Sequence, residues 1–132
     1  MDTSAYVAFM RDHPEVQAVV QIASSVYLNA VVVGELLAGF KKGRRTRQNE
    51  ERLREFFAEP RVTLLNVDHE TAVRYAVIRD YLRREGTPVP SNDLWIAATA
   101  SQHGLRVLTS DEHFLRVPQI IVDFFEPMTP SK

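Results

Sequence analysis

The chain contains no cysteine, so it can form neither a disulfide framework nor a thiolate metal site. No apolar run reaches the roughly 18–20 residues that a membrane-spanning helix needs. The first residues also lack the basic and apolar segments of a secretory signal. We therefore expect a protein of the cytoplasm that does not enter a membrane.

Several motifs that carry chemistry are missing as well. No glycine-rich phosphate loop is present, and no serine stands in a nucleophile elbow. Lysine and arginine number 16 against 17 acidic residues, and this balance argues against a general nucleic-acid coat but permits a local basic surface. The histidines have no metal-ligand spacing, and each is expected at the surface or at a helix cap: His13, His69, His103 and His113.

What is present fits one globular domain. The length of 132 residues, with 45% hydrophobic and 25% charged residues, is enough for a real core. No repeat or long linker divides the chain, so residues 1–126 are predicted to form a single domain. The remaining residues, 127–132, contain two prolines and are predicted to be a flexible tail.

Short apolar strands alternate with helices along the chain. This order predicts an α/β fold in which helices cover both faces of a parallel sheet. Ligands of such folds bind beyond the carboxyl ends of the strands, and Asp111 follows one of them directly. Strands are predicted at 26–28, 62–67, 106–108 and 120–122, and helices at 4–11, 14–24, 31–40, 46–59, 68–84, 92–103 and 111–116.

Four acidic residues stand where an acid is out of place or at a helix end: Asp2, Glu35, Asp93 and Asp111. Burying several carboxylates together is costly unless a cation neutralises them. If the four converge, they form a divalent-metal site, which is typical of phosphoryl-transfer enzymes. The spacing alone does not establish that they converge.

Each acid also has a simpler interpretation. Asp93 opens a helix that is apolar on nearly every side, so it should be buried, yet a first-turn acid also stabilises the helix dipole. Ser91 or Asn92 could cap that helix instead. Asp111 is a typical N-cap, and Asp2 could be an exposed terminal residue.

Glu35 points away from the apolar side of its helix, which is typical of a solvated face. Three small residues share its side, namely Gly34, Ala38 and Gly39. This pattern favours close approach by another element or by a ligand.

Four segments carry a resemblance to a known family: 1–5, 33–36, 90–98 and 108–114. In this order and at these separations they are similar to the motifs of PIN-domain proteins, and nearly the whole chain resembles the VapC toxins of bacterial and archaeal toxin–antitoxin pairs. The resemblance implies a three-layer α/β/α sandwich with a short central parallel sheet. It also implies that the acidic cluster of the family corresponds to the four acids above, and its polar residue after a strand to Thr109.

The resemblance further implies an endoribonuclease that depends on Mg²⁺ or Mn²⁺ and cuts structured RNA such as tRNA or rRNA. Such proteins are usually homodimers and are inhibited by a VapB antitoxin. On this basis we expect Asp2, Asp93 and Asp111 to ligate metal, and Glu35 to ligate it or to orient water. Thr109 would support them through its hydroxyl group.

A basic run follows the helix that carries Glu35, and Arg83 and Arg84 add a smaller pair. The run is either a solvated connection between helices or a surface for RNA phosphates. Its cations are Lys41, Lys42, Arg44, Arg45 and Arg47. The predicted helix 68–84 has two apolar stripes, of which one should face the core and the other a second copy or an antitoxin.

The sequence departs from the family at its start. PIN domains have a buried apolar strand before the first acid, whereas only Met1 precedes Asp2 here. We expect unpaired backbone groups beside the missing strand, and a true start a few residues upstream. Two alternatives to the toxin remain: a catalytically inactive PIN-like scaffold that binds a partner, and a PIN nuclease that acts on DNA or in RNA processing without an antitoxin.

Overall fold

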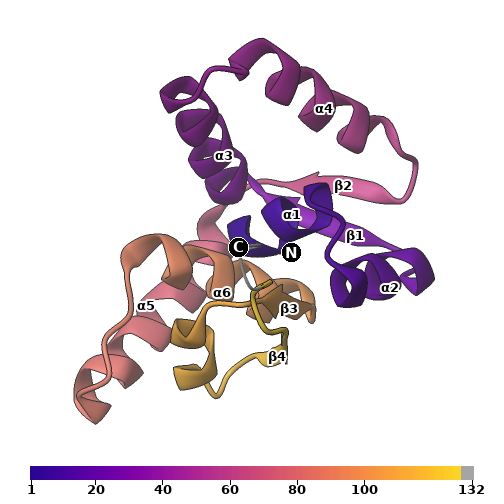
Figure 1. Cartoon of the computed structure of the whole chain (residues 1–132). Coiled ribbons are helices and arrows are strands. Elements are labelled where there is room, and N and C mark those ends of the chain that lie inside the picture. The colour runs from indigo at the N-terminus through magenta and orange to yellow at the C-terminus, as the bar shows by residue number, and fades with distance from the viewer. Residues whose placement is uncertain (129–132) are drawn as a thin grey trace.

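The computed structural model describes residues 1–128, and residues 129–132 of the predicted tail lie outside the described part. Helices and short strands alternate as the sequence predicts (Figure 1). The elements are α1 (Thr3–Met10), α2 (Pro14–Ile22), β1 (Val26–Asn29), α3 (Ala30–Lys42), α4 (Thr46–Ala58), β2 (Val62–Leu65), α5 (His69–Glu85), α6 (Ser91–His103), β3 (Arg106–Thr109), the 3₁₀ helix η1 (Glu112–Arg116) and β4 (Ile121–Phe124).

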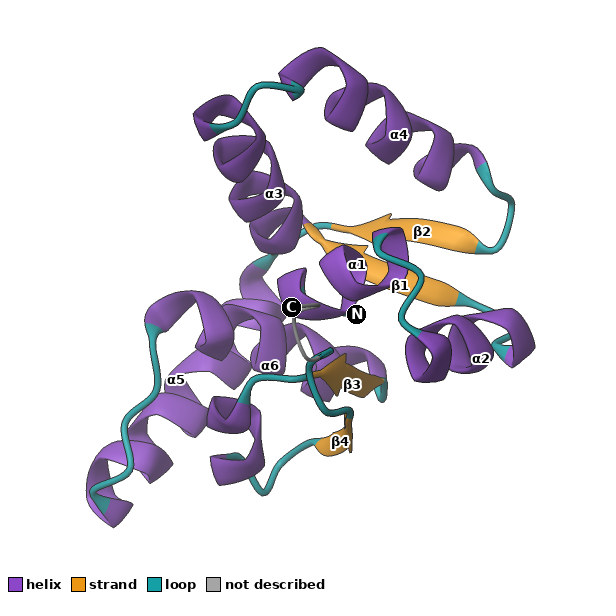
Figure 2. Cartoon of the chain, in the orientation of Figure 1, coloured by secondary structure: helices purple, strands orange, loops and turns teal. Residues whose placement is uncertain are grey.

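The strands form two parallel pairs, which confirms the predicted α/β class with short parallel strands. In the first pair β1 lies beside β2, with Val26 opposite Val62. In the second pair β3 lies beside β4, with Arg106 opposite Ile121. Helices surround both pairs, and the N-terminus lies between them (Figure 2).

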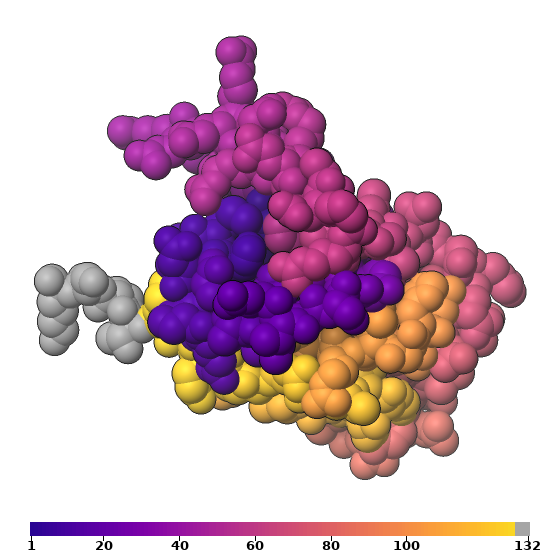
Figure 3. Space-filling view, turned by 90° about the vertical axis from the view of Figure 1, so that its right-hand side faces the viewer, coloured from indigo at the N-terminus to yellow at the C-terminus, as the bar shows by residue number. Residues whose placement is uncertain are grey.

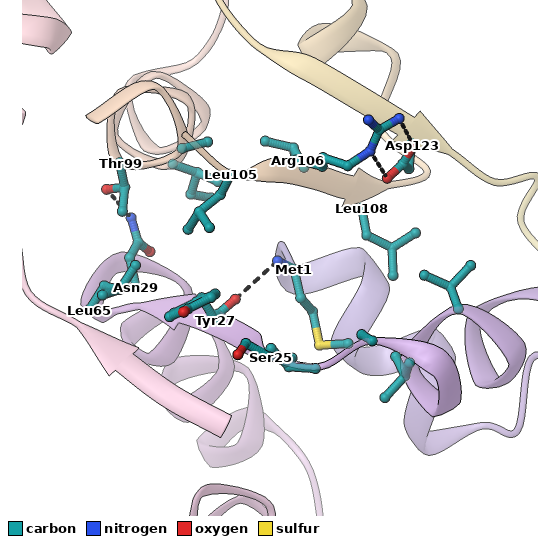
Figure 4. A pocket seen from close by; sticks show the side chains of 17 residues that line it. Met1, Ser25, Tyr27, Asn29, Leu65, Thr99, Leu105, Arg106, Leu108 and Asp123 are labelled. Atoms are coloured by element: carbon teal, nitrogen blue, oxygen red, sulfur yellow. Dashed lines mark hydrogen bonds and ion pairs between the residues drawn. The ribbon is translucent and has the colours of Figure 1, made fainter. Parts of the chain in front are cut away.

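The first two residues bridge the space between β1 and β3. The Met1 ammonium group donates to the carbonyl oxygen of Tyr27 at 3.0 Å, while the Asp2 amide donates to that of Leu108 at 3.3 Å. Successive residues of a strand bond to opposite neighbours in this way. Ahead of Met1 the two edges enclose a mainly apolar cavity of about 270 Å³, and no strand among residues 1–128 lies in it (Figure 4).

Local capping explains where several helices begin and end. The Asp68 side chain and Thr71 form a reciprocal capping box at the start of α5, and Gly86 ends that helix in the left-handed conformation at φ 70°, both as the sequence indicates. The predicted cap of α6 is wrong. Pro90 occupies the N-cap position, and its side chain has no acceptor for a capping bond, while the Asn92 amide donates to Glu35.

The core gathers around α6, whose buried residues are Leu94, Ile96, Ala97, Ala98, Thr99 and Ala100. On α5, Ile78 and Leu82 are each 1% exposed and face this core, whereas Val73 and Val77 are 44% and 58% exposed. One stripe of α5 is therefore internal and the other is open. Tyr75 stacks on Trp95 with ring centroids 4.0 Å apart, which ties α5 to the first turns of α6.

No helix within residues 1–128 is both long enough and apolar enough to cross a membrane.

Candidate acidic site

The structure brings the four predicted acids to one place. Asp2, Glu35, Asp93 and Asp111 all line a cavity of about 460 Å³, although they come from four separate segments of the chain. Asp2 precedes α1, Glu35 lies on α3, Asp93 in the first turn of α6, and Asp111 directly before η1. A second hollow beside it is lined by Glu35, Asp93, Asp111 and His113.

Asp2 is not an exposed terminal residue but is only 4% exposed. One of its carboxylate oxygens accepts from the Ala5 amide at 2.9 Å and from the Ser4 hydroxyl at 2.7 Å, and so caps α1. Burial raises the pKa of Asp2 above its ordinary value, and the donors, Thr109 foremost, oppose that rise because they stabilise the charged form. This network holds a carboxylate inside the protein.

Thr109 links Asp2 to Asp111. Its hydroxyl group donates to the second oxygen of Asp2 at 2.6 Å and accepts from the backbone amide of Asp111 at 2.9 Å. Its side chain is completely buried at the end of β3, so both bonds are shielded from solvent. Thr109 thus fixes two acidic segments relative to each other.

Asp93 has the most perturbed carboxyl group of the cluster. Its side chain is 15% exposed, and its pKa is raised from 3.8 to about 6. Desolvation is the main cause, and the negative charges of Asp111 and Glu35 add to it, while the bond to His113 opposes it. The position is therefore one where a nearby cation stabilises the ionised form.

Glu35 is held by two donors, the Thr3 hydroxyl at 2.7 Å and the Asn92 amide at 3.2 Å. These bonds join α3 to α1 and to α6. The expected close approach of another element at the small residues beside Glu35 is not found, because Gly34 and Gly39 are exposed and have open space around them. The bonds of Glu35 itself, rather than its small neighbours, place it at the cavity.

His113 belongs to the cluster, although the sequence gave no metal-ligand spacing for it. Its Nδ1 atom lies 3.0 Å from Asp93 Oδ2 and 3.1 Å from Asp111 Oδ1. Asp111 also caps η1 by accepting from the His113 amide at 2.9 Å, so the capping interpretation of Asp111 is confirmed as well. The available signal was the position of His113 two residues after Asp111, in a turn that points its side chain back.

The cluster fits a divalent cation. One ligand atom each from Asp93, Asp111 and His113 lies within 4.8 Å of the other two, whereas Asp2 and Glu35 line the cavity outside this group. Within the described residues, the second oxygens of Asp93 and Asp111 make no hydrogen bond, so both carboxylates keep lone pairs for an ion. Carboxylates with water suit Mg²⁺ and Mn²⁺.

The predicted RNA-binding cations lie away from this cavity. These exposed cations lie at the end of α3, on the turn that follows it and at the start of α4: Lys41, Lys42, Arg44, Arg45 and Arg47. This segment stands out from the rest of the surface (Figure 3). An arginine that the sequence did not single out, Arg11 at the end of α1, lines the acidic cavity instead.

Comparison with known proteins agrees with this architecture. Residues 1–120 match the family model of the PIN domain. The chain is 32% identical to ribonuclease VapC5 of Mycobacterium tuberculosis, covering 86% of this chain and 83% of that one. It is 28% identical to the tRNA(fMet)-specific endonuclease VapC of Salmonella typhimurium, covering 93% and 94%.

Among solved structures, the chain superposes on DNA-bound VapBC from Salmonella typhimurium with a TM-score of 0.83, at 27% identity, covering 93% of this chain and 94% of that one. The resemblance to VapC-type PIN proteins drawn from the sequence is thereby confirmed.

Proposed function

The chain belongs to the PIN domain family, and from that premise we propose that it is a ribonuclease toxin that depends on a divalent metal ion and is inhibited by an antitoxin. The observation that carries the proposal is the convergence of four acids on one cavity. A scaffold that only binds a partner gains nothing from the burial and the neighbouring negative charges that together raise the pKa of Asp93 to about 6. In a metal-dependent nuclease, the bound cation would offset the cost of keeping these carboxylates ionised.

In this proposal Asp93 and Asp111 hold a Mg²⁺ or Mn²⁺ ion through their carboxylate oxygens, and Asp2 helps directly or through water. When bound, the ion would supply an activated water and would offset charge on the scissile phosphate. Glu35 would orient that water. Thr109 keeps Asp2 and the Asp111 backbone in register through its two hydrogen bonds of 2.6 and 2.9 Å.

The substrate we propose is structured RNA, such as tRNA or rRNA. Support comes from the ribonuclease and tRNA endonuclease names of the relatives. Arg11 lines the cavity and would contact a phosphate near the cut, while the basic run 41–47 on the α3–α4 turn would contact phosphates farther along the RNA. Such contacts predict activity that falls as salt rises.

The partners we propose are a VapB-type antitoxin and a second copy of the chain, acting in the cytoplasm. Support for the antitoxin comes from solved toxin–antitoxin complexes that share this fold. The exposed apolar residues Val73 and Val77 on α5 offer a surface for one of these partners. Sedimentation at tens of micromolar tests the dimer, which a purely monomeric chain would contradict.

The test is cleavage of total tRNA and rRNA by the purified chain with Mn²⁺ or Mg²⁺. We expect cutting at discrete sites that EDTA and Asp93→Asn abolish. The matched control is Glu112→Gln, because Glu112 is an exposed acid next to Asp111 that lines neither hollow of the site. Its activity should equal that of the unchanged chain.

Three outcomes would contradict the proposal. Cutting that persists in EDTA or in Asp93→Asn would remove the acidic site from the reaction and point to a contaminating nuclease. A folded chain that binds RNA or an antitoxin but does not cut would favour the inactive scaffold. Cleavage of DNA but not RNA would favour the alternative PIN nuclease.

A further inference from the structure

The backbone position of His113 is fixed by hydrogen bonding and packing in η1. The backbone amide of His113 is fixed by the cap from Asp111. The next residue, Phe114, is 1% exposed and anchors η1 in the core. The imidazole is therefore held between two carboxylates, with its side chain 38% exposed toward the hollow that Asp93 and Asp111 line.

The distances in this cluster match those of a coordination shell. An octahedral ion with bonds of about 2.1 Å places neighbouring ligand atoms about 3.0 Å apart. Nδ1 of His113 lies 3.0 Å from Asp93 Oδ2 and 3.1 Å from Asp111 Oδ1. The hydrogen bond of Nδ1 runs to Asp93 Oδ2, and the approach to Asp111 Oδ1 is a further short contact, whereas a shared ion would account for both distances.

We propose that Nδ1 of His113 is a direct ligand of the metal ion, together with Asp93 and Asp111, and that this nitrogen makes the site prefer Mn²⁺ to Mg²⁺. The inference rests on the proposed function, because the ion is the same. Mg²⁺ takes oxygen ligands, while imidazole suits transition metals, whose affinity for such sites rises from Mn²⁺ to Co²⁺. The neutral ring would keep its proton on Nε2.

The variants compare ligand and hydrogen-bonding roles. Loss of a partner outside the coordination shell lowers metal affinity about 10- to 100-fold, so loss of a direct ligand in His113→Ala should weaken Mn²⁺ binding at least about tenfold. Mg²⁺ binding should weaken less. His113→Gln keeps a hydrogen-bonding group but removes the imidazole nitrogen. The matched control is His103→Ala, an exposed histidine at the end of α6.

The deciding readout is pulsed electron paramagnetic resonance of Mn²⁺ bound to the full chain, which detects directly coordinated ¹⁴N. We expect ¹⁴N modulation in the unchanged chain and in His103→Ala, and none in His113→Ala or His113→Gln, each checked for folding by circular dichroism. Calorimetric titration with Mn²⁺ and Mg²⁺ measures the change in preference.

Bound Mn²⁺ without ¹⁴N modulation, or full Mn²⁺ affinity in His113→Ala, would overturn the role of His113 alone and leave the proposed nuclease standing. Absence of any Mn²⁺ binding by the unchanged, folded chain would overturn the metal site itself, and with it both proposals.

Discussion

The raised pKa of Asp93 makes a quantitative prediction for the chain without metal. In the folded state the pKa is about 6, against an ordinary value of 3.8. The neutral carboxyl group is therefore favoured by folding. Its stabilising contribution is present below about pH 3.8 and is lost as the pH rises through about 6. Above about pH 7 Asp93 is ionised in the folded chain, and this partly buried charge destabilises the folded state.

Asp93→Asn removes this charge, so it should stabilise the metal-free chain at high pH. The difference between about 6 and 3.8 corresponds to about 3 kcal/mol at 1.36 kcal/mol per pH unit. Because solvent in the open cavity screens the carboxylate, we expect about half of this, ~1.5 kcal/mol, or a rise in Tm of about 5 °C. At pH 4 the rise should nearly vanish.

The assay is thermal and urea unfolding in EDTA at pH 4 and pH 8, with Glu112→Gln as the control that should show no such difference. Equal effects of Asp93→Asn at both pH values would refute the reasoning, as would destabilisation at pH 8. Either result would mean that packing or the bond to His113 outweighs the cost of the charge.

Three further perturbations test other parts of the structure. Mn²⁺ at 100 times its Kd should stabilise the chain by about 2.7 kcal/mol, which is measured as a higher Tm. Asp111→Asn should reduce this rise in Tm. No change in Tm at millimolar Mn²⁺ would contradict a preformed site. Thr109→Val should lower the free energy of unfolding in urea by about 2–3 kcal/mol, since two hydrogen bonds are lost. The control Thr63→Val, at an exposed position, should leave it nearly unchanged. Equal effects of the two substitutions would contradict the linking role of Thr109. An apolar Val-Ile-Val-Val segment added ahead of Met1 should raise Tm and slow hydrogen exchange of the Tyr27 and Leu108 amides. A Gly-Ser-Gly-Ser segment of the same length is the control and should have a smaller effect. If the two extensions behave alike, the cavity between β1 and β3 does not accept a strand.

The alternation of apolar strands with helices was readable because both periodicities are local. Asp68 and Gly86 marked the ends of α5 for the same reason. The division of the strands into two pairs was harder to foresee, because pairing depends on what lies between β1 and β3. Met1 bonds to β1 at Tyr27 and Asp2 bonds to β3 at Leu108, and no local pattern indicates these long-range contacts.

The four acids were found as local anomalies, but nothing local could show that they share a cavity. That follows from the ladder of bonds that joins Asp2 to Thr109, and Glu35 to Thr3 and Asn92. His113 was missed because ligand spacing on one helix is a poor guide when the partners come from different elements. Its partner Asp93 is 20 residues away and on another helix.

Capping and site chemistry are compatible in this protein, although the sequence presents them as alternatives. Asp2 caps α1 and Asp111 caps η1, and each cap uses lone pairs on one side of the carboxylate while the residue still lines the cavity. The cap fixes the orientation of an acid that would otherwise rotate. A helix start is therefore a favourable place for a metal ligand, because the backbone amides that bond to one carboxylate oxygen also orient the other.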